Sequence, residues 1–293
     1  MSVRIHAINQ LSRMVGAREA SEVMKLAKKQ ERLEAAWRRK MKQRVEEITR
    51  ELLNNARKTG RLNFETVSFE QIVMEHSFSV LKEGIKSAKP KSLVRSEKLA
   101  SPPKSQIPRS LKALRILWDS WKKTGKMPPR QRVIAKKLRT AYTQKLQSIW
   151  VKYGDEFRSG ETASTARAVQ AVQRGADVVN SRAKMIVETE TTFYYNQARR
   201  EVYDESPDVT HYLFVAIRDH ATTKWCKSRN YLVYKKGDPL LDKETPPCHW
   251  NCRSELLPLT PLNPAHARII GEKSKQRRNN RPAPLPPGWT GAR

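Results

Sequence analysis

One apolar stripe runs through residues 21–59 and constrains the fold of this chain more than any other feature. Its members recur at spacings of seven, three and four residues, as on one face of an α-helix. They are Leu26, Leu33, Trp37, Met41, Val45, Ile48 and Leu52. Ser21 suits an N-cap, and Gly60 suits the position after the last turn. A helix of this length would be about 58 Å long, so we expect a hairpin, a bundle helix or a helix that docks on a partner.

The composition favours elongated helical parts over one globule. The chain has 293 residues, which suggests about two domains, and its hydrophobic content of 38% allows only a thin core. No apolar run is long enough to span a membrane, and the N-terminus lacks the apolar region of a signal peptide. We therefore expect a protein that stays in the cytoplasm where it is made and has no membrane partner.

The formal net charge is +29 and the pI is near 10.3. Self-repulsion of this size is usually offset by a polyanion. DNA or RNA is the expected partner, and an acidic protein surface, membrane headgroups or a merely solvated basic surface are the alternatives.

The rest of the N-terminal half repeats the helical pattern. A second helix is predicted over 69–87, and a Pro-, Ser- and Lys-rich linker over 89–109. Residues 110–158 predict a basic helical hairpin whose turn contains Pro128 and Pro129. Between residues 82 and 145, 19 Lys or Arg stand against three acidic residues, a net charge of +16.

This basic segment predicts nonspecific binding to phosphates, because its cations alternate with Trp, Tyr and Leu. Base-specific contact through a helix-turn-helix is a weaker alternative. The candidate nucleic-acid-binding residues, two of them in a basic Pro-rich tail over 263–293, are Lys122, Lys123, Lys126, Arg130, Arg132, Lys136, Lys137, Arg139, Arg277 and Arg278. We expect the tail to be extended.

The periodicity changes near residue 211. One or two helices are predicted over 161–203, and strands over 211–219, 231–234 and 253–259. The predicted fold class is therefore mainly α with a small β module (α+β): long N-terminal helices, a helical middle, a small C-terminal sheet bearing Cys and His, and an extended basic tail.

All three cysteines lie close to this sheet, at Cys226, Cys248 and Cys252. Zn²⁺ needs four N, S or O ligands, which often come as close pairs. His249 and Cys252 form one such pair and Cys226 adds a third ligand. Cys248 is set aside because it adjoins His249, and the fourth ligand would be His220, Asp219 or water. The alternative is a loop pinned by Pro246, Pro247 and Trp250 with plain buried thiols.

The cluster gives little reason to expect an enzyme. Cys226 and His249 could form a nucleophile pair, but no orienting carboxylate stands at a recognisable position. The run of His249, Asn251 and Cys252 is only faintly similar to metal-dependent nucleases, whose signature needs further histidines downstream. We expect no catalytic activity, and a zinc-dependent nucleic-acid enzyme or toxin-like module is the alternative.

The order of a strand, Asp219, a Cys-containing loop, a short strand and PP-x-H-x-N-C-R resembles the phage Mu F-type head-morphogenesis family of minor capsid proteins. The resemblance covers about residues 160–260. The matching residues are Asp219, Thr222, Cys226, Pro246, Pro247, His249, Asn251, Cys252 and Arg253, with Arg182, Ile186, Thr189 and Glu190 upstream. Thr223 and Ser254 stand where the family pattern has cysteines, and these departures bear on metal binding.

The resemblance implies a minor head protein of a tailed phage. It implies association with the portal protein, contact with a major capsid or scaffolding protein, and a place in the virion head, either interior or neck, after assembly in the host cytoplasm. Double-stranded DNA is the implied nucleic acid. The expected domains are 1–88, 89–109, 110–158, 159–262 as the family domain, and 263–293. A structural connector without a DNA role is the further alternative.

Overall fold

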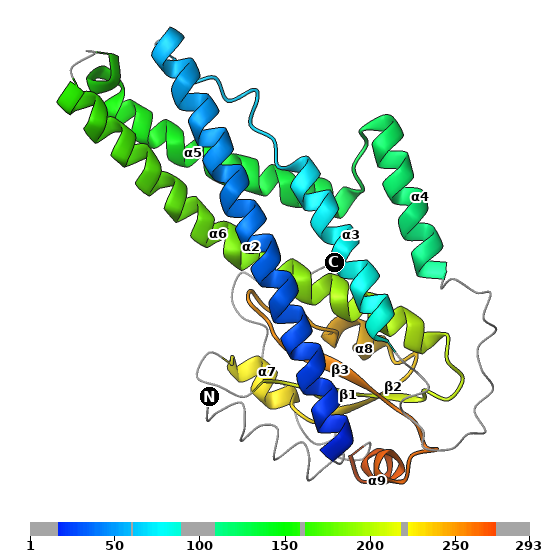
Figure 1. Ribbon diagram of the computed structural model, residues 1–293. Coiled ribbons are helices and arrows are strands. Elements are labelled where there is room, and N and C mark those ends of the chain that lie inside the picture. The colour runs from blue at the N-terminus through cyan, green and yellow to red at the C-terminus, as the bar shows by residue number, and fades with distance from the viewer. Residues whose placement is uncertain (1–16, 60, 89–108, 159–161, 218–221, 274–293) are drawn as a thin grey trace. The chain divides into compact units, whose positions relative to one another are not determined.

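A computed structural model describes residues 17–59, 61–88, 109–158, 162–217 and 222–273. These residues form eight helices and three strands, which confirms the mainly α fold with a small β module (Figure 1). The elements are α2 (Ala17–Thr59), α3 (Glu70–Ser87), α4 (Arg109–Thr124), α5 (Pro129–Arg158), α6 (Thr162–Asp204), β1 (His211–Val215), α7 (Lys224–Arg229), β2 (Val233–Lys235), α8 (Pro239–Glu244), β3 (Glu255–Leu259) and α9 (Pro264–Lys273).

The chain divides into two compact units. The sheet unit comprises Met1–Leu33, Phe78–Ile116 and Glu188–Arg293, and the helical unit comprises Glu34–Ser77 and Leu117–Val187. Helices α2 and α6 contribute residues to both units. The predicted linker over 89–109 lies outside the described residues except for its last residue, and the predicted domain boundaries stay predictions.

The helical unit has a single apolar core to which α2, α3, α5 and α6 contribute. The predicted stripe of α2 is buried here, from Trp37 to Leu52. Trp37 stacks on the buried His76 of α3 with ring centroids 3.4 Å apart. Gly175 of α6 lies where an added Cβ would meet the Ile149 side chain of α5 at 2.2 Å. The glycine therefore lets two helices approach closely.

The sheet unit is built on a three-stranded antiparallel sheet with the order β2-β1-β3. Tyr212 pairs with Tyr234 of β2 and with Pro258 of β3. Side chains of a strand alternate between its two faces. Accordingly Tyr212 and Phe214 join a core with the cysteines, whereas Leu213 and Val215 join a second core with α9 and the start of α2.

Several short elements differ from the sequence predictions. The strand predicted over 211–219 ends at Val215, and Cys226 lies on helix α7 rather than on a loop. Thr223 caps α7, and Asp238 caps α8 with Pro239 in the first turn. These are ordinary helix-start signals, but each helix has only six residues and no apolar period to reveal it.

The tail prediction is also wrong at its beginning. Pro264–Lys273 forms α9 instead of an extended segment. The Asn263 side chain accepts hydrogen bonds from the backbone N–H groups of Ala265 and His266, and Ile269 is buried in the core that includes Leu213. A cap and an apolar anchor thus stabilise the helix. Residues 274–293 lie outside the described part of the chain.

Candidate metal centre

Three buried cysteines meet in the sheet unit. Cys226 comes from α7, whereas Cys248 and Cys252 come from the connection between α8 and β3. Their Sγ atoms all lie within 4.8 Å of one another, and the Cys226 and Cys252 Sγ atoms are 3.8 Å apart. None of the three side chains is more than 2% exposed. The cysteines are free thiols, so three soft donor atoms face one another away from solvent.

His249 joins this cluster through one ring nitrogen. Its Nε2 lies 3.1 Å from the Cys226 Sγ, and its Nδ1 lies 2.7 Å from the Trp250 carbonyl oxygen. A carbonyl oxygen only accepts, so we assign the proton to Nδ1, which donates to Trp250. Many metal-binding histidines are oriented by such a bond, which leaves Nε2 as the nitrogen that binds once it has lost its own proton.

The cluster shifts the proton affinities of its members. Burial opposes a charged His249, but contacts with Cys226 and Cys252 outweigh it and raise the pKa of His249 to about 10. Burial likewise opposes ionisation of Cys252, but hydrogen bonds from Cys226, Cys248 and His249 hold its pKa well below the usual value. Burial and the adjacent sulfurs raise the pKa of Cys248. The Cys252 sulfur therefore favours the thiolate, the form that binds metals.

The loop that carries Cys248, His249 and Cys252 turns sharply at Asn251. This residue has a φ of +57°, a conformation that Asn tolerates better than most residues. The Cys252 N–H donates to the His249 carbonyl oxygen across the turn, at 3.2 Å. A tight turn at Asn251 thus brings His249 and Cys252 to the same side of the loop.

A row of polar side chains on α6 holds the same loop and the start of β3. Thr189 accepts a hydrogen bond from the Asn251 N–H at 3.0 Å, and Thr192 donates to the Cys252 carbonyl oxygen at 2.6 Å. Asn196 donates to the Ser254 carbonyl oxygen and accepts from the Leu256 N–H. The row ends at Arg199, whose guanidinium forms a buried ion pair with Glu255 at 2.9 Å. We call Thr189, Thr192, Asn196 and Arg199 the polar row of α6.

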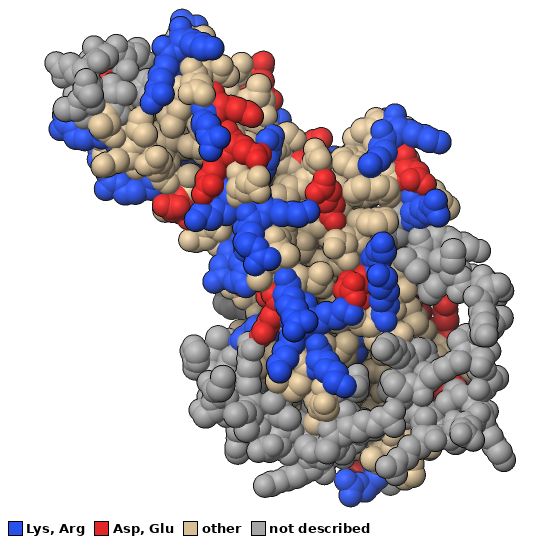
Figure 2. Space-filling view, viewed as in Figure 1, with Lys and Arg blue, Asp and Glu red and all other residues tan. Residues whose placement is uncertain are grey.

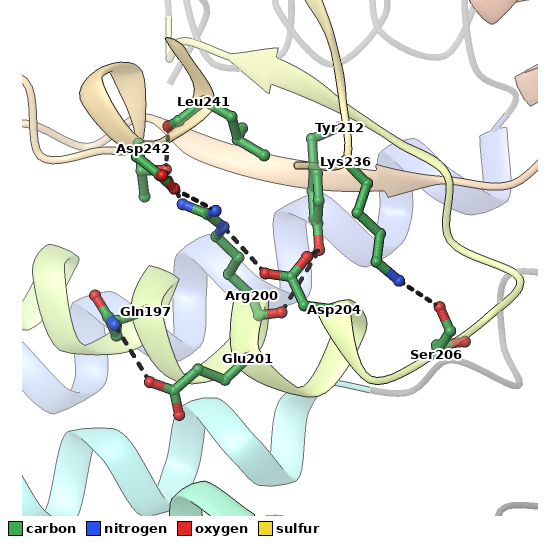
Figure 3. Close-up of polar contacts among 10 residues, drawn as sticks. Gln197, Arg200, Glu201, Asp204, Ser206, Tyr212, Lys236, Leu241 and Asp242 are labelled. Carbon is green, nitrogen blue, oxygen red and sulfur yellow. Dashed lines mark hydrogen bonds and ion pairs between the residues drawn. The ribbon is translucent and has the colours of Figure 1, made fainter. Parts of the chain in front are cut away.

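The other end of the loop begins at α8, and α6 holds this end as well (Figure 3). Arg200 pairs with Asp242 of α8 and with Asp204, and it donates to the Thr245 hydroxyl at 3.1 Å. The Tyr212 hydroxyl of β1 donates to Asp204 at 2.6 Å. One helix therefore fixes both ends of the segment that bears Cys248, His249 and Cys252.

Residues 134–257 match the family model described as Phage Mu protein F like protein. This part of the chain is Mu F-like. The match confirms the predicted resemblance and begins within α5, earlier than the region of about 160–260 on which the resemblance rests. No match to the chain was found among curated proteins or among solved structures.

The structure brings some of the predicted site residues of the Mu F-like segment together and leaves others outside the described part of the chain. Cys226, His249 and Cys252 come together as predicted from their spacing. Cys248, which the sequence prediction set aside, joins them, with its Sγ within 4.8 Å of the Cys226 and Cys252 sulfurs. His220 and Asp219 lie outside the described residues. Pro246 and Pro247 are buried beside the cluster, and Arg253 is half-buried. The metal-binding role of these residues stays a prediction.

The predicted basic residues lie on α4, α5 and the turn between these helices. Arg130 is half-buried, and the exposed members are Lys122, Lys123, Lys126, Arg132, Lys136, Lys137 and Arg139. Figure 2 shows Lys and Arg side chains around the end of α4 that leads into this turn. Lys122 lies 5.4 Å from the ring centroid of Trp118, and Arg139 donates to the Phe64 carbonyl oxygen. Arg277 and Arg278 lie outside the described residues.

None of the helices in the described ranges is long and apolar enough to cross a membrane.

Proposed function

We propose that this protein is a minor head protein of a tailed phage and acts in head morphogenesis. The support is the Mu F-like segment over residues 134–257. The proposed partners are the portal protein and a major capsid or scaffolding protein, with a final position in the head interior or at the neck. The role is structural rather than catalytic.

We further propose that the α4–α5 hairpin contacts packaged double-stranded DNA without sequence preference. The observation that carries this proposal is a run without acidic residues. From Ser120 to Gly154 the chain has ten Lys or Arg and no Asp or Glu. Most of the basic side chains between Lys122 and Arg139 are exposed. A surface of one sign attracts phosphates without reading bases.

Salt dependence gives the sharpest test of the DNA contact. Each neutralised phosphate releases counterions, so the logarithm of affinity falls with the logarithm of salt concentration by about 0.9 per contact. We expect the full-length protein to bind unrelated duplexes equally well and to lose affinity steeply with salt. An absence of binding at about 50 mM salt would refute the DNA contact.

Neutral variants locate the binding surface. Replacement of Lys123, Lys126 and Lys136 by Gln removes three exposed charges from the hairpin, so we expect the salt slope to fall by up to about 2.7. The matched control replaces Lys40, Lys42 and Lys58 of α2, which are exposed in the same unit. Lys40 and Lys42 already face Glu75 and Glu46. Equal effects of the two variants would argue against the hairpin.

Head-protein association is tested separately from DNA binding. We expect the portal protein, co-expressed with this protein, to be captured after nuclease treatment. Loss of capture with nuclease would mean that DNA bridges the two proteins. Capture that weakens in the Lys123, Lys126 and Lys136 variant would mean that the hairpin meets an acidic protein surface.

We also propose that the cysteine cluster binds Zn²⁺. The donors fit this ion, because Zn²⁺ prefers thiolate sulfur and imidazole nitrogen in a tetrahedral arrangement. When bound, the ion would hold Cys226 of α7 to the loop that carries Cys252. Full-length protein purified under reducing conditions should contain one zinc per chain by elemental analysis. Plasmid nicking that requires metal and is lost in His249→Ala would instead support the enzyme alternative.

A further inference from the structure

We propose that Cys248 is a zinc ligand, so that Cys226, Cys248, His249 and Cys252 close the coordination sphere of a structural site. This inference rests on the zinc binding proposed above and adds the identity of the fourth ligand. That identity decides the kind of site, because structural zinc has four protein ligands and catalytic zinc keeps a position for water or substrate.

The sulfur positions match a tetrahedral zinc site. Zn–S bonds of about 2.3 Å at the tetrahedral angle separate two sulfurs by about 3.8 Å. The Cys226 and Cys252 Sγ atoms are 3.8 Å apart. The Cys248 Sγ lies within 4.8 Å of each of these sulfurs. The three thiols are thus close enough together to bind a single ion.

His249 supplies a nitrogen ligand on the side of the cluster where Cys226 lies. Its Nε2 lies 3.1 Å from the Cys226 Sγ. A tetrahedral site places such a nitrogen about 3.5 Å from sulfur, a separation that the distance to the Cys226 Sγ approaches. The bond from Nδ1 to the Trp250 carbonyl already orients the ring.

An open site with water in place of Cys248 is the competing arrangement. A cavity of about 10 Å³ adjoins Cys226 and His249 and is also lined by Thr222, Arg253 and Ser254. This is about the space of one water molecule. Cys248, however, is only 2% exposed, and its Sγ already lies within 4.8 Å of the two sulfurs that both arrangements share. The closed site uses a donor that is in place, and it makes the ion a clasp between α7 and the loop.

X-ray absorption at the zinc edge of the wild-type, full-length protein counts the ligands directly. The proposal predicts three sulfurs at about 2.3 Å and one nitrogen at about 2.0–2.1 Å. Zinc bound by two sulfurs and two lighter atoms would overturn the closed site and leave zinc binding intact. A protein that takes up no zinc under reducing conditions would overturn zinc binding as well.

Two variants identify the fourth ligand. Cys248→Ser should lower zinc affinity at least 10-fold in competition with a chelator, because even the loss of an outer-shell partner costs about 10–100-fold. His220→Ala, which removes the ligand suggested by sequence spacing, should leave the affinity unchanged. The opposite result, with zinc lost in His220→Ala and retained in Cys248→Ser, would overturn the proposal. Cobalt spectra of each variant would report tetrahedral coordination independently of affinity.

Discussion

The two halves of α6 are one continuous helix, but they pack by different means. Residues of its first half, in the helical unit, are buried through small apolar side chains such as Ala171, Val179 and Val187. Its second half, in the sheet unit, also buries apolar side chains such as Tyr194 and Tyr195, but it carries in addition the polar row of α6, which pairs with residues 251–256. Apolar side chains can pack against many partners. Buried polar side chains form all their hydrogen bonds in only one alignment of the helix with the loop. The polar half therefore positions the cysteine loop, and the apolar half serves as scaffold.

The largest expected effect comes from breaking the polar half at its ion pair. Glu255→Gln leaves Arg199 buried with its charge unpaired, so we expect a loss of about 3–5 kcal/mol from the free energy of unfolding. Urea unfolding, followed by hydrogen exchange of peptides from the sheet unit, measures it. The matched control, Arg199→Met with Glu255→Leu, removes both charges and should recover most of the loss. If Glu255→Gln unfolds like wild type, the pair does not hold the loop.

The apolar half should respond less to a single change. Val179 is 2% exposed, and Val179→Ala removes two buried methyl groups, so we expect a loss of about 2 kcal/mol from the free energy of unfolding. The neighbouring Val178 is 51% exposed and provides the control. Val178→Ala should change stability by less than about 0.5 kcal/mol. Equal losses in both variants would contradict the assigned packing face.

The smallest of these effects concerns pH and is confined to the helical unit. Burial first, and then the charge of Lys40, hold the pKa of His76 well below its usual value. The unfolded chain therefore takes up a proton near pH 6.5 that the folded unit resists, so stability is present above this pH and falls as the pH decreases. We expect up to about 1.4 kcal/mol lost per pH unit below the unfolded pKa.

The His76→Phe variant separates this effect from other titrations. Phe keeps a ring against Trp37 but cannot take up a proton, and His76 is the only histidine in the sequence of the helical unit. Hydrogen exchange of helical-unit peptides between pH 7.5 and 5.5, corrected for intrinsic rates, should lose its pH dependence in the variant. If wild type and variant show the same pH dependence, a group other than His76 causes it.

The difference between apolar and polar packing also explains how much of the fold could be predicted from the sequence. The long helices were predicted to within a few residues, because the stripe from Leu26 to Leu52 and the face of α5 repeat with helical period. The polar row of α6 could not be read this way. Thr192 and Asn196 have no apolar period, and their partners lie about 60 residues away.

The cysteine cluster was partly predictable. Cys226, His249 and Cys252 follow from ligand spacing, and Thr223 and Asp238 carried cap signals for the short helices on either side. Cys248 was set aside because neighbouring side chains usually diverge. In the structure the Cys248 Sγ lies within 4.8 Å of the other two sulfurs, and α6 holds the loop through a contact between residues 62 positions apart. Spacing along the chain does not reveal such a contact.

We propose that the polar half of α6 and the cysteine loop form one structure that a bound metal ion clasps. Hydrogen exchange of the wild-type protein, with zinc and after chelation under reducing conditions, tests it most directly. We predict that chelation removes protection from peptides within 188–204 and 222–259 and leaves those within 166–187 unchanged. Protection that stays the same throughout, or that falls equally along the whole of α6, would contradict the claim.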